Sequence, residues 1–175
     1  MQLCARCHQI QKTCCQGTSI ILSQGDVRRI TQATGNNDFY RLEYHPDLSY
    51  LATYAYDPNW EKYVVLPGGR MRQLKMDERS RDCIFLGNQG CVLASDIRPL
   101  MCRLYPYTYN EFGMIGLVLN EDLICPLHAL QAGETVLDML ALPHTQADPW
   151  RKMYYAELRS EYLERVAGSQ QVCTG

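Results

Sequence analysis

The nine cysteines of this 175-residue chain constrain its fold and its chemistry more than any other feature. Eight of them form two groups of four, whereas Cys173 lies near the C-terminus, where chain ends fray, and is assigned no role. The groups are Cys4, Cys7, Cys14 and Cys15, and then Cys83, Cys91, Cys102 and Cys125. A single buried thiol is an ordinary apolar core group, but such a set in an intracellular chain indicates metal binding. The sequence therefore predicts that all eight thiols come together around one or two metal centres.

Charge and hydropathy patterns limit the compartment in which we expect the protein and the classes of partner that it can bind. The first ten residues, MQLCARCHQI, have no basic start and no apolar run, so we expect no secretory signal. The longest apolar stretches, 114–119 and 136–142, are too short to span a bilayer. The net charge is -2, and the two signs are mixed along the chain, which is not the pattern of a nucleic-acid surface. We therefore expect a cytoplasmic protein that works with a protein partner and with neither nucleic acid nor membrane.

The first cysteine group combines a Cys-x2-Cys pair, Cys4 and Cys7, with the adjacent pair Cys14 and Cys15. Two thiolates at the Cys-x2-Cys spacing can converge on one metal. Adjacent side chains on an extended backbone point in opposite directions. The adjacent pair can therefore reach two different metals, or one of its thiolates binds while the other packs.

The second cysteine group is more scattered, with 7, 10 and 22 residues between successive members. Two four-thiolate sites are the simplest arrangement, and one cluster shared between the groups is the competing arrangement. Structural zinc sites usually contain two close Cys-x2-Cys pairs, and this chain has one. Scattered thiolates suit a larger centre, so we predict an iron–sulfur cluster, 4Fe-4S or 2Fe-2S, with zinc as the alternative.

Local patterns predict a small, irregular α+β domain that is stabilised by metal. Ser23 is the expected N-cap of a helix, Asp26 the acidic member of its capping box, and Gly35 its C-terminal glycine. Alternating residues predict strands at 40–44 and 50–56, a hairpin with arms 63–66 and 71–74, a second hairpin over 83–93, and a strand within 112–120.

The remaining elements are helical. Ser95 or Asp96 is expected to cap a short helix that carries Cys102, with Pro99 in its first turn. The apolar stretch 134–142 predicts a buried helix, and Asp148 and Pro149 predict the start of a last helix that ends near residue 168. The fold class is therefore α+β, with short antiparallel strands and a C-terminal helix. We expect one domain, 1–175, with a cysteine-bearing part over 1–126 and a helical part over 127–170.

The motifs of residues 1–126 resemble a known family. They are C4-x2-C7, C14-C15, C83 with C91, the block R98-P99-x2-C102-R103-x-Y105-P106, and a last C125. This pattern is similar to that of the bacterial and archaeal CxxCxxCC cysteine-cluster family, which is described as zinc- or iron-chelating. A related cysteine-rich region occurs in flagellin lysine N-methylases. One departure is that six residues separate Cys7 from Cys14, where the family usually has two.

The resemblance implies metal chelation and also suggests a role for two arginines. Arg98 and Arg103 flank Cys102, and a centre ligated by four thiolates carries net negative charge. Guanidinium groups beside it would offset that charge and donate hydrogen bonds to sulfur. We therefore expect Arg98 and Arg103 to contact the cofactor, with surface salt bridges as the alternative.

Three classes of function are compatible with the sequence. The first is redox or electron-transfer work by an iron–sulfur cluster. The second is a binding module that zinc stabilises, and the third is an iron–sulfur enzyme or accessory factor for protein modification such as methylation. The chain has no G-x-G-x-x-G, G-x-S-x-G or H-E-x-x-H motif, and we assign no catalytic residue.

Overall fold

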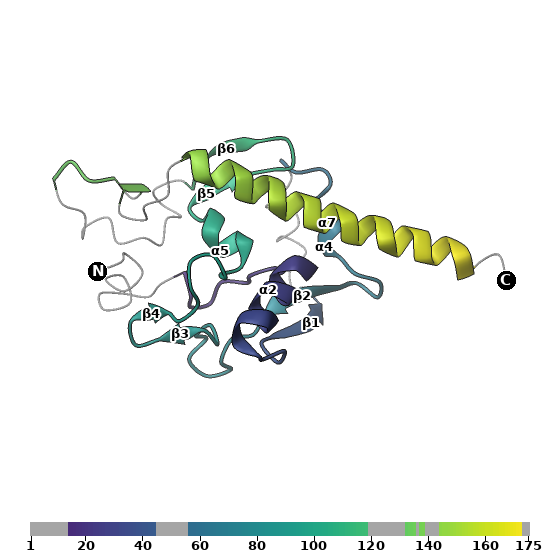
Figure 1. Cartoon of the computed structure of the whole chain (residues 1–175), viewed down its shortest axis with the longest axis horizontal. Coiled ribbons are helices and arrows are strands. Elements are labelled where there is room, and N and C mark those ends of the chain that lie inside the picture. The colour runs from purple at the N-terminus through teal and green to yellow at the C-terminus, as the bar shows by residue number, and fades with distance from the viewer. Residues whose placement is uncertain (1–13, 45–55, 119–131, 136, 139–143, 173–175) are drawn as a thin grey trace.

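The computed structural model describes residues 14–44, 56–118, 132–135, 137, 138 and 144–172. Helices and short antiparallel strands pack into a small α+β fold, as the sequence predicts (Figure 1). The elements are α2 (Gln24–Thr34), β1 (Tyr40–Tyr44), α4 (Trp60–Val64), β2 (Arg70–Leu74), β3 (Leu86–Gly87), β4 (Gly90–Cys91), α5 (Leu100–Leu104), β5 (Tyr107–Tyr109), β6 (Met114–Leu117) and α7 (His144–Val172).

Helix α2 begins and ends where the sequence predicts. The Ser23 hydroxyl accepts a hydrogen bond from the Asp26 N–H at 2.9 Å, and the Asp26 carboxylate accepts one from the Ser23 N–H, which completes the capping box. At the other end Gly35 has φ 68°, the left-handed conformation that glycine adopts without strain, and its N–H bonds to the Thr31 carbonyl.

Strand β2 lies between two antiparallel partners. On one side it pairs with β1, so that Tyr40 faces Leu74 and Tyr44 faces Arg70. On the other side residues 20–22 run along it, with hydrogen bonds from the Leu22 N–H to the Arg72 carbonyl and from the Leu74 N–H to the Ile20 carbonyl, each 2.9 Å. The predicted strand over 40–44 is confirmed, and most of the one predicted over 50–56 lies outside the described residues.

The predicted hairpin with arms 63–66 and 71–74 is wrong in its first arm. Residues 60–64 form the one-turn helix α4, because Trp60, Tyr63 and Val64 recur at helical spacing and are all buried. The turn itself is present, since Leu66 and Arg70 form an isolated antiparallel bridge around residues 67–69.

The second predicted hairpin is confirmed as the pair β3–β4, in which Leu86 faces Cys91.

The short helix that carries Cys102 is also confirmed as α5, but its predicted cap is wrong. Its N-cap is Pro99, which has no side-chain donor or acceptor, and the helix starts at Leu100 rather than after Ser95 or Asp96. The predicted strand within 112–120 is β6, and it pairs with β5, which the sequence reasoning missed.

Helix α7 is longer at both ends than predicted. It starts at His144 and ends at Val172, so Pro149 lies inside it and Asp148 is not its cap. Ala147 is fully buried, and this packing holds the turn that precedes the proline. Asp148 instead forms ion pairs with Arg151 and Lys152, both 2.8 Å. Most of the predicted buried helix over 134–142 lies outside the described residues.

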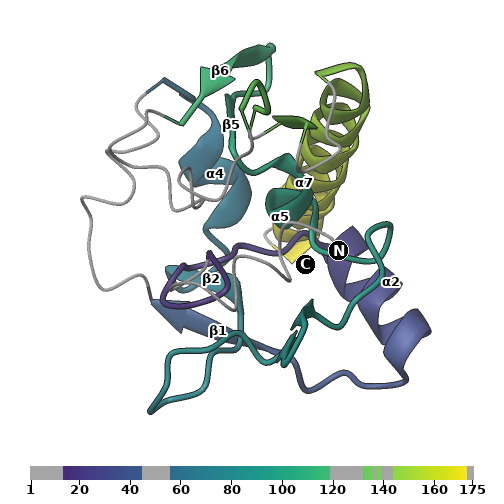
Figure 2. The same ribbon diagram turned by 90° about the vertical axis from the view of Figure 1, so that its left-hand side faces the viewer.

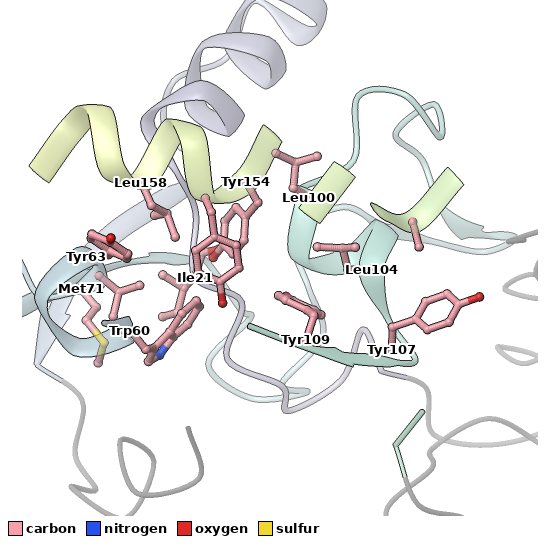
Figure 3. Close-up of a cluster of buried hydrophobic side chains, with 13 residues drawn as sticks. Ile21, Trp60, Tyr63, Met71, Leu100, Leu104, Tyr107, Tyr109, Tyr154 and Leu158 are labelled. Carbon is pink, nitrogen blue, oxygen red and sulfur yellow. The ribbon is translucent and has the colours of Figure 1, made fainter. Parts of the chain in front are cut away.

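The described side chains form two apolar clusters. The larger gathers under α7, where Tyr154 and Leu158 point toward Ile21 and Trp60 (Figure 3). Figure 2 shows the elements that contribute to it, with α4 and α5 beside α7. The smaller cluster, which we call the cysteine-side core, joins α2 and β2 to the region of β3 and β4. Its buried members are Ile20, Leu22, Val27, Ile30, Phe39, Leu74, Cys83, Phe85 and Leu93.

Buried polar contacts also attach α7 to the body. Arg72, 9% exposed, pairs with Glu161 at 2.7 Å. The Tyr155 hydroxyl donates to the Asp57 carboxylate, and burial raises the pKa of both groups. The last turns of α7 project beyond the rest of the body in Figure 1. In the part of the chain that the structure describes, no helix has the length and apolarity needed to cross a membrane.

We predict that Leu158→Ala lowers the free energy of unfolding by about 2–5 kcal/mol, because Leu158 is 2% exposed and its loss leaves a cavity under α7. Leu163→Ala on the same helix is the matched control. Leu163 is 58% exposed, so we expect a change within about 0.5 kcal/mol. Urea unfolding followed by circular dichroism measures both, and equal losses would contradict this account of how α7 is held.

Candidate metal centre

Main-chain pairing brings Cys15 of the first group beside Cys83 of the second. The Cys83 N–H donates to the Cys15 carbonyl at 2.7 Å, and the Gly17 N–H donates to the Arg81 carbonyl at 2.9 Å. Gln16 and Asp82 lie between these bonds as an antiparallel bridge, and the Gln16 amide donates to the Asp82 carboxylate at 2.6 Å. In this register Cys15 and Cys83 are directly opposite and on the same face.

Two further thiols approach this pair from other segments. Cys91 comes from strand β4 and Cys102 from helix α5, and both pack, with Cys15, against the cysteine-side core in which Cys83 is buried. We call Cys15, Cys83, Cys91 and Cys102 the cysteine quartet. It draws one member from the first sequence group and three from the second, which favours a shared centre over two separate groups of four.

The electrostatics of the cysteine quartet reflect this proximity. Burial is the main cause that raises the pKa of Cys83 to about 12, and the neighbouring Cys15 and Cys91 contribute to this rise. Burial also raises the pKa of Cys102 well above its ordinary range, again with contributions from the other three cysteines. Burial and the neighbouring cysteines therefore favour the protonated thiol at Cys83 and Cys102, and metal binding would require their deprotonation because thiolate is the form that binds metal.

The quartet combines four sulfur side chains with apolar surroundings. All four donors are sulfur, their surroundings are apolar, and the Phe85 N–H donates a hydrogen bond to the Cys83 sulfur at 3.4 Å. Such N–H···S bonds stabilise ligating thiolates. No disulfide joins any two of the described cysteines. Among the residues that the structure describes, no group of three or more Cys, His, Asp or Glu side chains is arranged so that it could hold a metal ion.

The other predicted ligands are not part of the quartet. Cys14 is half-buried and is not among the residues that pack against the cysteine-side core. Cys14 and Cys15 both lie in a turn, so the rule for adjacent side chains on an extended backbone does not apply to them. Cys4, Cys7 and Cys125 lie outside the described residues. Their roles as ligands stay predictions.

The two predicted cofactor-binding arginines donate to backbone carbonyls. Arg98 Nε bonds to the Leu93 carbonyl at 3.1 Å. Arg103 Nε bonds to the Arg98 carbonyl at 2.7 Å, and its NH2 group donates to the Asp96 carbonyl. The Arg103 guanidinium also lies 5.7 Å from the Trp150 ring centroid, a cation–π contact that sequence reasoning missed because it joins α5 to α7. Both arginines therefore hold the loop that leads into α5.

Comparisons with known proteins add no assignment. No family profile, no curated protein and no solved structure matches the chain. The resemblance to the cysteine-cluster family therefore stays a prediction from the motifs.

We predict that Arg103→Lys lowers the free energy of unfolding by about 1–3 kcal/mol. A lysine cannot reproduce the two carbonyl contacts and the stacking on Trp150 that a planar guanidinium makes. Arg28→Lys makes the same chemical change at an exposed position of α2 and is expected to have an effect within about 0.5 kcal/mol. Thermal or urea unfolding tests the pair. Equal effects would show that Arg103 does not hold the loop.

Proposed function

We propose that this protein carries an iron–sulfur cluster bound by the cysteine quartet and serves in cytoplasmic electron transfer with a protein partner. The observation that carries the proposal is the antiparallel pairing that sets Cys15 opposite Cys83, beside Cys91 and Cys102. Four thiols from four separate segments, all facing one apolar cluster, favour a centre with several metal corners over a compact structural zinc site.

The surrounding residues support that chemistry. When bound, an iron–sulfur cluster supplies one-electron transfer at a potential that hydrogen bonds to sulfur and burial adjust. Here Phe85 and Leu93 are buried beside the quartet and exclude water, and the Phe85 N–H is aimed at the Cys83 sulfur. Arg98 and Arg103 add positive charge close to α5, which would offset the negative charge of a thiolate-ligated centre.

The remaining predicted ligands extend the proposal. Cys4, Cys7, Cys14 and Cys125 would complete a second centre or serve the first. Because Cys15 packs against the cysteine-side core and Cys14 is not among the residues that do, we propose that Cys14 belongs with Cys4 and Cys7 rather than with the quartet.

We predict that protein made and isolated without oxygen is brown and contains iron and acid-labile sulfide. Cys15→Ser and Cys102→Ser should each lose most of the visible absorption, because the two residues come from different sequence groups but share one centre. Cys173→Ser is the matched control, since the sequence assigns that cysteine no role, and its spectrum should equal that of the parent.

Visible and electron paramagnetic resonance spectra with iron, zinc and sulfide analysis decide the matter. A colourless preparation with stoichiometric zinc and no sulfide would show that the protein binds zinc and not an iron–sulfur cluster. A brown preparation that keeps its spectrum in both Cys15→Ser and Cys102→Ser would show that the ligand assignment is wrong.

We further predict that metal removal loosens the cysteine-side core but leaves α7 largely formed. Ligands from distant segments make metal binding part of the folding free energy of those segments, whereas Tyr154 and Leu158 of α7 pack in the other cluster. Hydrogen exchange should rise over residues 15–17, 81–91 and 100–104 after chelation and stay slow over 150–162. Uniform loss of protection along the chain would contradict this division.

A further inference from the structure

Asp26 is a fully buried carboxylate that accepts hydrogen bonds from two helices. Its Oδ2 atom accepts from the Ser23 N–H at 3.2 Å, within the capping box of α2. Its Oδ1 atom accepts from the Leu100 N–H at 3.0 Å, at the first residue of α5. Asp26 is 0% exposed, so neither contact competes with solvent. One side chain therefore caps its own helix and a second helix that lies 74 residues further along the chain.

Helix α5 has no cap of its own. Its N-cap residue, Pro99, makes no side-chain hydrogen bond, and the helix is five residues long. A single helical turn is not stable in isolation, so its position depends on contacts from other elements. Cys102 is the third residue of that turn, and the Asp26 bond to Leu100 therefore bears directly on where the Cys102 sulfur lies.

The Asp26 carboxylate is itself held rigidly. Arg29 donates to Asp26 Oδ1 at 2.7 Å and to both carboxylate oxygens of Glu157 on α7, at 3.1 Å for Oε2. The Ser23 hydroxyl donates to the same Glu157. The Glu157 carboxylate lies against Gly25, and a Cβ atom added to Gly25 would come within 2.1 Å of that carboxylate. The glycine thus allows α7 to approach the first turn of α2 and to fix Arg29 and Asp26.

We propose that Asp26 is a positioning residue of the metal centre, because it caps α5 and so holds Cys102 among Cys15, Cys83 and Cys91. The inference rests on the proposed function, because it assumes that Cys102 binds a metal. The capping of α5 by Asp26 depends only on the hydrogen bond from the Leu100 N–H. Asp26 acts through Leu100 and the α5 backbone, and its negative charge also contributes to the raised pKa of Cys102.

The test compares Asp26→Ala, Asp26→Asn and Ser23→Ala in the full chain, isolated without oxygen. Asp26→Ala removes the acceptor for Leu100, so amide exchange over residues 100–105 should become about fivefold faster, the ratio for loss of an ordinary helix cap. Its iron content should fall, or its electron paramagnetic resonance signal should change shape. Asp26→Asn keeps one carbonyl oxygen that can accept from the Leu100 N–H. Its amide exchange over residues 100–105 and its iron content should therefore be close to those of the parent. Ser23→Ala removes the hydroxyl that caps α2 and donates to Glu157, but it leaves the Asp26–Leu100 bond in place. It should therefore change the exchange rate and the iron content less than Asp26→Ala does.

Exchange over 100–105 that is unchanged in Asp26→Ala, or that is accelerated equally in Ser23→Ala, would overturn the inference. Altered exchange with an unchanged spectrum and iron content would show a cap that does not position the ligand, which also overturns it. If Asp26→Ala does not fold, Asp26→Ser gives the same comparison, because its shorter side chain does not reach Leu100. A parent protein without iron and sulfide would refute the proposed function, and the exchange data would still decide whether Asp26 holds α5.

Discussion

The pairing of residues 15–17 with residues 81–83 is the constraint on which the rest of the site depends. Its two main-chain hydrogen bonds place Cys15 opposite Cys83, and the contact between Gln16 and Asp82 on the other face fixes the register. A shift of one residue would turn Cys15 to the opposite face and leave Cys83 without that neighbour. This strand pairing therefore decides which face of the strand carries the Cys15 and Cys83 side chains.

The two apolar clusters differ in the elements that build them and in the cysteines that they contain. The larger cluster is built on α7 and aromatic residues such as Trp60 and Tyr154, and it contains no described cysteine. The cysteine-side core contains Cys83 and packs against the other members of the quartet. Met101 packs against both clusters, and α5 therefore connects them. The described cysteines thus lie on one side of the molecule, and the packing of α7 lies on the other.

Local signals in the sequence predict local structure well and tertiary contacts poorly. The capping box of Ser23 and Asp26 and the glycine turns of β3–β4 are confirmed because each is decided within a few residues. The β-propensity of Tyr63 and Val64 predicts a strand. Their spacing from Trp60 is helical, however, and it indicates α4. The start of α7 was placed at Asp148 and Pro149 because nothing local shows that Ala147 is buried.

The site shows the same limit. Both cysteine groups were identified from spacing, but the membership of the quartet depends on a pairing between residues 15 and 83 that no local pattern encodes. Asp26 was recognised as a cap of α2, whereas its bond to Leu100 joins residues 74 apart. The guanidinium of Arg103 was expected at the cofactor, and its hydrogen bonds instead reach the carbonyls of Arg98 and Asp96.

The most direct test of the shared centre is anomalous diffraction at the iron absorption edge from crystals grown without oxygen. The account predicts an iron peak enclosed by the sulfur atoms of Cys15, Cys83, Cys91 and Cys102. An iron peak that lies away from these four sulfur atoms, or a structure in which the four are dispersed with no metal between them, would contradict it.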